Sequence, residues 1–262
     1  MTRRIWSILA LTALCVAAAF LLPAIPQPLS YHDFADHRPL FGIDNFLDVA
    51  SNIGFLLVGV AGLAIVFRPA TQFEFYAERW PYAVFFIGML LTAAGSAYYH
   101  LVPENERLFW DRLPMTIAFM SLIATQVVDR LSVRAGLALL LPMLLVGVAS
   151  VVYWRATERA GVGNLTPYAI LQAYSVVMLL LIAVLYPSRY TRGNDLYWVA
   201  AGYVAAKILE TFDRQLLELG SLVSGHSLKH LAAAAAGFVV CRALWLRSLE
   251  PAEQRVGDLQ RG

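Results

Sequence analysis

The chain has 262 residues, of which 59% are hydrophobic and 15% charged, and its mean hydropathy is +0.62. A soluble domain carries roughly 25% charged residues, so this composition excludes an ordinary soluble protein and favours one that crosses a membrane several times. The net charge of +2 gives no basic excess for nucleic acid, and Cys15 and Cys241 both fall in apolar segments, where they indicate neither a disulfide nor a metal pair.

Eight apolar segments each approach the ~20 residues that a helix needs to cross the hydrocarbon. In chain order they cover residues 5–22, 46–67, 81–101, 113–130, 134–152, 166–186, 196–213 and 226–246. Only a short turn, RLSVR, separates the fourth from the fifth. Because helices satisfy their own backbone polar groups in lipid, the sequence predicts one all-α integral membrane domain with eight spans.

The first segment is open to two interpretations. MTRR followed by IWSILALTALCVAAAFLLP is similar to the charged start and apolar core of a signal peptide. No clear small-residue cleavage site follows, and Pro23 with two further prolines comes next. We therefore predict a retained helix over residues 1–23, a membrane domain over 24–248 and a polar cytoplasmic tail over 249–262, and leave cleavage of the first helix open.

The arginines predict the orientation. With the N-terminus in the cytoplasm, twelve arginines fall in inner segments and six in outer ones, which supports both termini in the cytoplasm. His100 at the end of the third segment, Asp111 before the fourth and the stretch GHSLKH (225–230) at the start of the eighth then lie at one depth. The sequence thus predicts that these polar groups meet at the extracytoplasmic face.

A metal site is the strongest functional signal. His226 and His230 are four residues apart, which places both imidazoles on one helix face, the spacing that two histidines use to bind one zinc ion. Catalytic zinc takes three protein ligands and leaves a position for water, and His100 is the obvious third ligand. Asp111 would hold that water and take its proton, while the Ser96 hydroxyl would bind a substrate carbonyl or developing oxyanion.

Each of these residues alone has a simpler explanation. A histidine at a helix end is commonly an interfacial polar residue, an aspartate in a loop is commonly just solvated, and a serine in a membrane helix is commonly a packing residue. It is the combination at one depth, in a chain with five histidines, that favours the zinc site.

Further polar residues fall inside or beside the spans. KILETFD places Lys207, Glu210 and Asp213 three apart along one stripe, either as a paired brace of the bundle or as support behind the histidines. Asn52 near the outer end of the second segment either bonds into the same cavity or holds two helices together. Lys229, between the two histidines, is expected to point away from them and extend to the outer interface.

Four stretches of the chain resemble the alkaline ceramidase family. They are DNFLDVASN (44–52), GSAYYH (95–100), FWDRLPM (109–115) and GHSLKH (225–230). They follow the family's order and cover nearly the whole chain beyond the first segment. The family belongs to a superfamily of seven-helix membrane proteins that includes the adiponectin-receptor-like proteins. The resemblance implies a seven-helix bundle plus one added N-terminal helix, as expected in bacterial members, and hence the bacterial inner membrane.

The same resemblance implies a membrane-embedded zinc hydrolase that cleaves the amide of a ceramide-like lipid taken from the bilayer. By the match, zinc is bound by His100, His226 and His230, Asp111 orients or deprotonates the water, and Ser96 assists. The alternative is a receptor-like or regulatory member of the superfamily without efficient catalysis. A transporter would predict internal repeats and helices broken at mid-membrane, and the sequence shows neither.

The chain departs from the family in the loop before the second segment. Characterised eukaryotic ceramidases carry an acidic stretch with tryptophan and glutamate there, where calcium binds, whereas YHDFADHRPLFGIDNFLD has neither residue. Its aspartates supply oxygen ligands suited to calcium and are also ordinary in an exposed loop, so calcium binding stays open. They are Asp33, Asp36, Asp44 and Asp48. The lipid headgroup and any protein partners cannot be predicted.

Overall fold

The computed structural model describes residues 2–220 and 222–251, and the regular structure in this part of the chain is helical apart from two isolated β-bridges. The all-α fold class is therefore confirmed. The elements are α1 (Arg3–Leu21), η1 (Leu29–His32), α2 (Phe46–Ala50), α3 (Ile53–Phe67), η2 (Tyr76–Glu78), α4 (Arg79–Leu101), α5 (Asn105–Arg130), α6 (Val133–Arg159), α7 (Thr166–Leu185), α8 (Asp195–Thr211), α9 (Asp213–Gly220) and α10 (Gly225–Leu246). Residues 252–262 of the predicted polar tail lie outside the described part.

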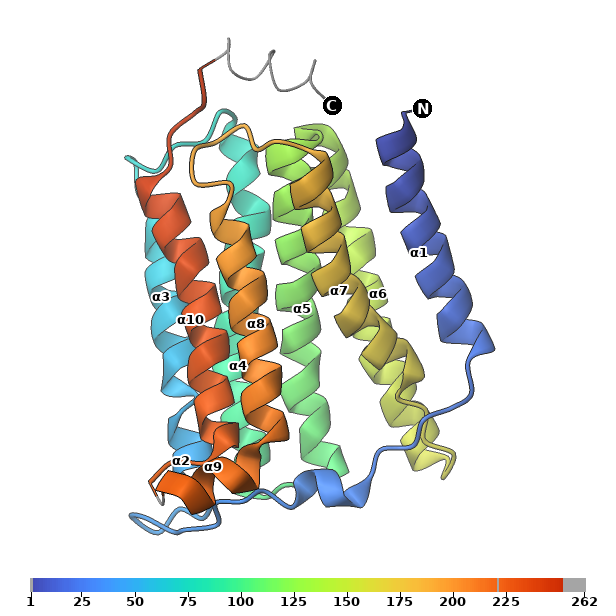
Figure 1. Ribbon diagram of the computed structural model, residues 1–262, viewed down its shortest axis with the longest axis vertical. Helices are drawn as coiled ribbons and strands as arrows, with labels where there is room; N and C mark the ends of the chain where they lie inside the picture. The colour runs from blue at the N-terminus through green and yellow to red at the C-terminus, as the bar shows by residue number, and fades with distance from the viewer. Residues whose placement is uncertain (1, 221, 252–262) are drawn as a thin grey trace.

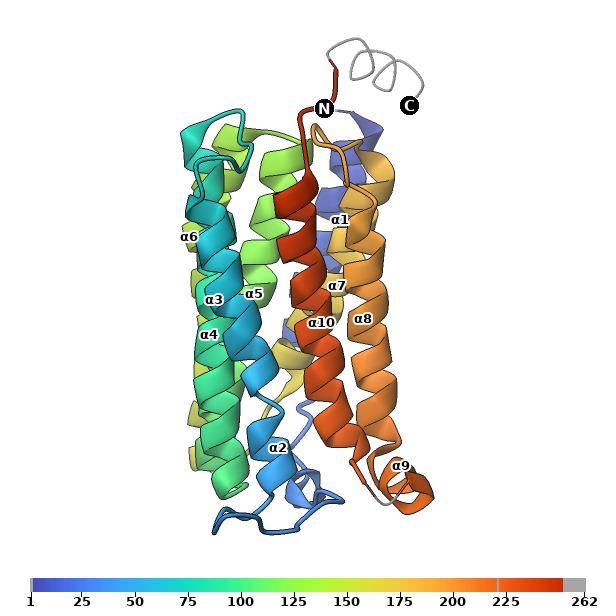
Figure 2. The same cartoon turned by 90° about the vertical axis from the view of Figure 1, so that its left-hand side faces the viewer.

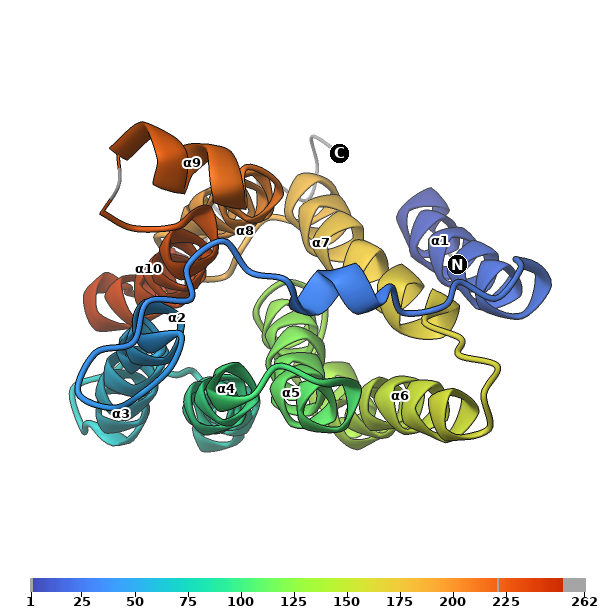
Figure 3. The same ribbon diagram turned by 90° about the horizontal axis from the view of Figure 1, so that it is seen from below.

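The long helices lie side by side in one bundle (Figures 1 and 2). The start of α1 and the end of α10 are at the upper end in Figure 1, and η1, α2 and α9 are at the lower end. Six helices (α3, α4, α5, α7, α8 and α10) contact one another in a closed ring. Helix α6 packs on the outside against α5 and α7, and α1 packs against α7 (Figure 3).

Six helices of the described chain are long and apolar enough to cross a membrane, as expected for a multi-pass membrane protein. They are α1, α2 with α3, η2 with α4, α6, α7 and α10. The prediction of eight spans is confirmed only to this extent, because α5 and α8 are outside the set. Helix α8 has 17 residues, and α5 carries charged pairs near both ends, Asp111–Arg112 and Asp129–Arg130. Most of α5 is buried between α4, α6 and α7.

The fourth and seventh predicted segments have wrong boundaries at the lower end of the bundle, whereas the second keeps its predicted bounds of 46–67 and is interrupted within them. The fourth segment begins at Asn105, eight residues before the predicted start, so Asp111 lies in a helix and is buried instead of standing in a solvated loop. The second segment is interrupted between α2 and α3, where the Asn52 amide donates to the Asp48 carbonyl at 2.8 Å. The seventh ends at Thr211, and Asp213 begins α9, so Asp213 does not continue the stripe of Lys207 and Glu210.

A buried ion pair joins three helices at the upper end. The Arg247 Nη1 donates to the Asp129 Oδ2 at 3.2 Å and to the Tyr82 hydroxyl at 3.0 Å, and Tyr82 donates to the same carboxylate oxygen at 2.5 Å. Both charged side chains are at most 7% exposed. The contact ties the end of α10 to α4 and α5, far from the lower end where the histidines gather.

Candidate metal centre

Three histidines meet at the lower end of the bundle. His100 comes from the last turn of α4, and His226 and His230 come from the first turns of α10. All three are buried, and each offers a ring nitrogen within 4.8 Å of the others. Within residues 2–220 and 222–251, this is the one group of three or more histidine, cysteine or acidic side chains placed to hold a metal ion.

The geometry of this group fits a tetrahedral metal ion. Zinc–nitrogen distances of about 2.0–2.1 Å place two ligand nitrogens roughly 3.3 Å apart. The Nε2 atoms of His100 and His226 are 3.2 Å apart. The Nδ1 of His230 bonds to the Ser51 hydroxyl at 2.8 Å, which leaves its Nε2 for a metal. Three imidazoles without a carboxylate are a donor set that suits zinc.

The start of α10 is fixed by several polar contacts. Ser224 caps the helix, and the backbone N–H of His226 donates to the Asp213 Oδ1 at 2.7 Å. A Cβ at Gly225 would lie 2.2 Å from the carbonyl oxygen of Leu209, so only glycine allows α10 to begin this close to the end of α8. Asp213 therefore supports the site through the backbone of a histidine and not through its ring.

Helix α2 supplies two residues that the sequence analysis did not assign to the site. Asp48 is fully buried, and its Oδ1 accepts hydrogen bonds from the hydroxyls of Ser227 at 2.6 Å and Ser224 at 3.3 Å. Ser51, one turn further on, bonds to the ring of His230. The available signal was the spacing within DNFLDVASN, which places both residues on one helix face toward α10.

Ser96 and Asp111 lie together where α4 crosses α5. Both are buried, and the Ser96 side chain lies next to the Asp111 carboxylate. Gly95 makes the crossing possible, because a Cβ there would lie only 2.0 Å from the carbonyl oxygen of Trp110. The structure thus brings the predicted serine and aspartate side by side, and both share a cavity with His230.

The segment between α1 and α2 crosses the lower end of the bundle (Figure 3), and its Phe34 covers two of the histidines. The Phe34 ring packs against the rings of His100 and His226, with centroids 4.7 and 4.2 Å apart. His32 is separate from the metal centre, because its ring bonds to the Tyr99 hydroxyl at 2.8 Å and to Asn105 at 2.9 Å. Burial lowers the pKa of His32 below its usual 6.5.

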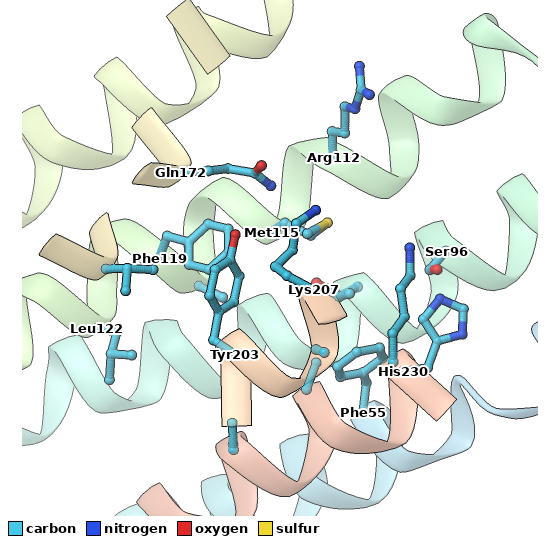
Figure 4. Close-up of a pocket in the computed structure, with 18 of the residues that line it drawn as sticks. Phe55, Ser96, Arg112, Met115, Phe119, Leu122, Gln172, Tyr203, Lys207 and His230 are labelled. Atoms are coloured by element: carbon cyan, nitrogen blue, oxygen red, sulfur yellow. The ribbon is translucent and has the colours of Figure 1, made fainter. Parts of the chain in front are cut away.

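A cavity of about 290 Å³ extends from the metal centre into the bundle. Ser96, Asp111 and His230 line its polar end, and Figure 4 shows Ser96 and His230 far from Phe119 and Leu122 at the apolar end. Its walls come from α3, α4, α5, α7, α8 and α10, with Tyr31 of η1 at its edge. The cavity is therefore polar at the end next to the metal centre and apolar at the other.

A charged cluster also lines the cavity. Glu210 forms ion pairs with Lys207 and with Lys229, the latter at 2.6 Å. The predicted pairing of Lys207 with Glu210 is present. The expectation for Lys229 is wrong, because its side chain lines the cavity and is 17% exposed instead of extending to the interface. The reason is helical geometry, since Lys229 is three residues from His226 and shares its face.

The remaining predicted residues lie apart from the metal centre. The amide nitrogen of Asn52 bonds to carbonyls of α2, so this residue holds the break between α2 and α3 and does not line the cavity. The four aspartates considered for calcium form no group of three or more ligands within the described residues. Asp36 accepts three hydrogen bonds from Arg38, two from the guanidinium at 2.8 and 2.7 Å and one from the backbone N–H at 3.1 Å, and they lower the pKa of Asp36. Asp33 forms ion pairs with His37 and with Arg214, and Asp44 takes part in neither of these pairs.

Comparison with known proteins adds no family to this description. A scan against protein-family models found no match, and neither did a search of curated proteins. What the protein does must therefore be argued from the metal centre and the cavity.

Proposed function

We propose that this protein is a membrane-embedded, zinc-dependent hydrolase that cleaves the amide bond of a ceramide-like lipid. The observation that carries the proposal is the joining of a buried three-histidine group to a cavity that also holds Asp111 and Ser96. The resemblance to alkaline ceramidases supports the same reaction. The seven helical units from α2–α3 to α10, with α9 as a short outer turn, would correspond to the family's bundle, and α1 would be the added helix.

The metal ligands, Asp111 and Ser96 would each have a separate role in the reaction. A zinc ion on the three histidines would lower the pKa of a bound water to about 7. Asp111 is placed to accept a proton from the attacking water and to return it to the nitrogen of the leaving amine. Ser96 lies beside Asp111 and would donate a hydrogen bond to the amide carbonyl as negative charge develops. The reaction consumes one water and yields a fatty acid and an amine.

The placement of the cavity supports a substrate from the bilayer. We propose that α5 and α8 also cross the membrane, since both line the cavity and complete a ring whose other four helices, α3, α4, α7 and α10, are apolar enough to do so. The acyl chain would then occupy the part lined by Phe119, Leu122 and Leu179. The excess of arginines at the opposite end of the bundle would place the metal centre at the extracytoplasmic face.

Metal content and lipid-amide turnover of the purified protein test the proposal. We expect about one zinc per chain in the wild type and its loss in His226→Ala, with turnover lost in parallel. His37→Ala is the matched control, because His37 stands exposed in the covering loop. Zinc without hydrolysis of any lipid amide would favour the receptor-like alternative, and a folded wild type without metal would overturn both.

A further inference from the structure

The lining of the cavity carries more positive than negative charge. The cations Arg112, Lys207 and Lys229 face the carboxylates of Asp111 and Glu210, which leaves an excess of one positive charge when all five are ionised. Buried charges are ordinarily paired, and at membrane depth an unpaired one is costly. The excess therefore indicates an anion that the protein itself does not supply.

Arg112 is the cation of this set whose guanidinium has an N–H unpaired among the described residues. The residue is 4% exposed and forms no ion pair within the described chain. Its Nη2 donates to Gln27 at 2.6 Å, whereas its Nη1 is buried without any acceptor there. The guanidinium lies 4.5 Å from the ring of Trp154, 5.4 Å from Tyr31 and 5.1 Å from Tyr168. These rings stabilise a cation but offer the free N–H no oxygen.

Tyr31 links Arg112 to the lysines. Its ring lies beneath the guanidinium, and its hydroxyl donates to the Glu210 Oε1 at 3.4 Å. That one carboxylate serves two ammonium groups, Lys207 and Lys229. Figure 4 shows Lys207 extending from α8 across the cavity toward Met115 of α5. All three cations line the cavity that also holds Ser96, Asp111 and His230.

We propose that the lipid amide bears an anionic group on the amine side of its scissile bond, as in an N-acyl amino acid, and that Arg112, Lys207 and Lys229 bind this group. The acyl chain belongs in the apolar part of the cavity, so the amine-side substituent is the part that reaches the cations. A carboxylate and a phosphate both offer the oxygens that a guanidinium pairs with. This inference rests on the proposed hydrolase and narrows its substrate class.

Non-hydrolysable sulfonamides separate binding from catalysis. The probes are N-(dodecylsulfonyl)glycine, the neutral N-(dodecylsulfonyl)ethanolamine and the phosphate ester of the latter, titrated into the purified full-length protein by calorimetry. We expect the glycine or the phosphate probe to bind at least about tenfold more tightly than the neutral one, since hydrogen bonds to charged groups are the strong ones. Preference for the carboxylate or the phosphate identifies the acid, and equal affinity of all three probes overturns the inference.

Four variants assign the preference to residues. Arg112→Met and Lys229→Met should each reduce the preference for the charged probes over the neutral one severalfold. Glu210→Gln should increase this preference by removing a competing carboxylate. Arg107→Met, on the same helix but outside the cavity lining, should leave it unchanged. Loss of the preference in Glu210→Gln would instead assign the cluster to bracing α8 against α10 and overturn the inference.

Hydrolysis distinguishes the two proposals. If neutral lipid amides are cleaved as fast as N-acyl amino acids, the hydrolase stands and the anionic substrate is refuted. If no lipid amide is cleaved but the charged sulfonamides bind with the expected preference, the anion site stands and the hydrolase is refuted.

Discussion

Gly95 sets the distance between the two helices that hold Ser96, His100 and Asp111. In Gly95→Ala, the new methyl group would start 2.0 Å from the carbonyl oxygen of Trp110, whereas real Cβ contacts below 3.0 Å essentially do not occur. The backbones of α4 and α5 must therefore separate by about 1 Å or more, because the obstacle is main chain and cannot rotate away. A misplacement of about 1 Å can cost on the order of 100-fold in rate, and overpacking costs about 1–3 kcal/mol.

Two measurements check this variant. We expect thermal unfolding in detergent at a lower temperature than the wild type, and a loss of lipid-amide turnover greater than the loss of zinc, because only one metal ligand lies on α4. Gly220→Ala is the matched control, since a Cβ there meets nothing within 4 Å. Wild-type stability together with wild-type turnover in Gly95→Ala would refute the claim that this crossing fixes the site.

Three further predictions concern contacts around and away from the metal centre. Ser51→Ala removes the partner of the His230 ring, and chelator competition should show zinc affinity lowered about 10–100-fold in a folded protein; unchanged affinity would exclude Ser51 as an orienting residue. Burial holds the pKa of His32 below its usual 6.5, so the unfolded chain binds more protons than the folded one as the pH falls. The contribution of the neutral His32 ring to the free energy of unfolding is therefore complete above pH 6.5 and declines below it. The unfolding temperature of the wild type should therefore fall more steeply than that of His32→Gln between about pH 7 and pH 5, and parallel curves would contradict this. Arg247→Met strands the buried Asp129 carboxylate and should lower the free energy of unfolding by about 3–5 kcal/mol, while adding Asp129→Asn should recover part of it; an additive double variant would mean that the two side chains do not interact.

The meeting of the three histidines follows from the sequence by simple topology. Successive helices of a bundle alternate in direction, so the end of one apolar segment and the start of the next lie at the same level. His100 ends one such segment and GHSLKH begins another, and counting the segments between them was enough to place them at one end. The i, i+4 spacing then aligned His226 with His230. Both steps depend only on periodicity and segment count.

Rotational detail could not be predicted in the same way. Lys229 was expected to leave the site because it is adjacent to His230 in sequence, yet its angular position is close to that of His226, three residues earlier. Which of these faces looks into a cavity depends on the packing of α8 and α7, and that is a tertiary property. Phe34 could not be predicted either, because a loop without periodicity gives no sign that it folds beneath the bundle.

Helix α5, which we propose as a further membrane span, falls outside the set of apolar helices for a physical reason. Hydropathy reports which residues tolerate lipid, but α5 is enclosed by α4, α6 and α7, so lipid does not select its side chains. That enclosure buries Asp111 and Arg112, and a dry environment strengthens each of their electrostatic contacts. The least apolar of the long helices is then the one best suited to carry the chemistry, and Arg112, with a buried N–H that no described residue accepts, is where its ligand should be sought first.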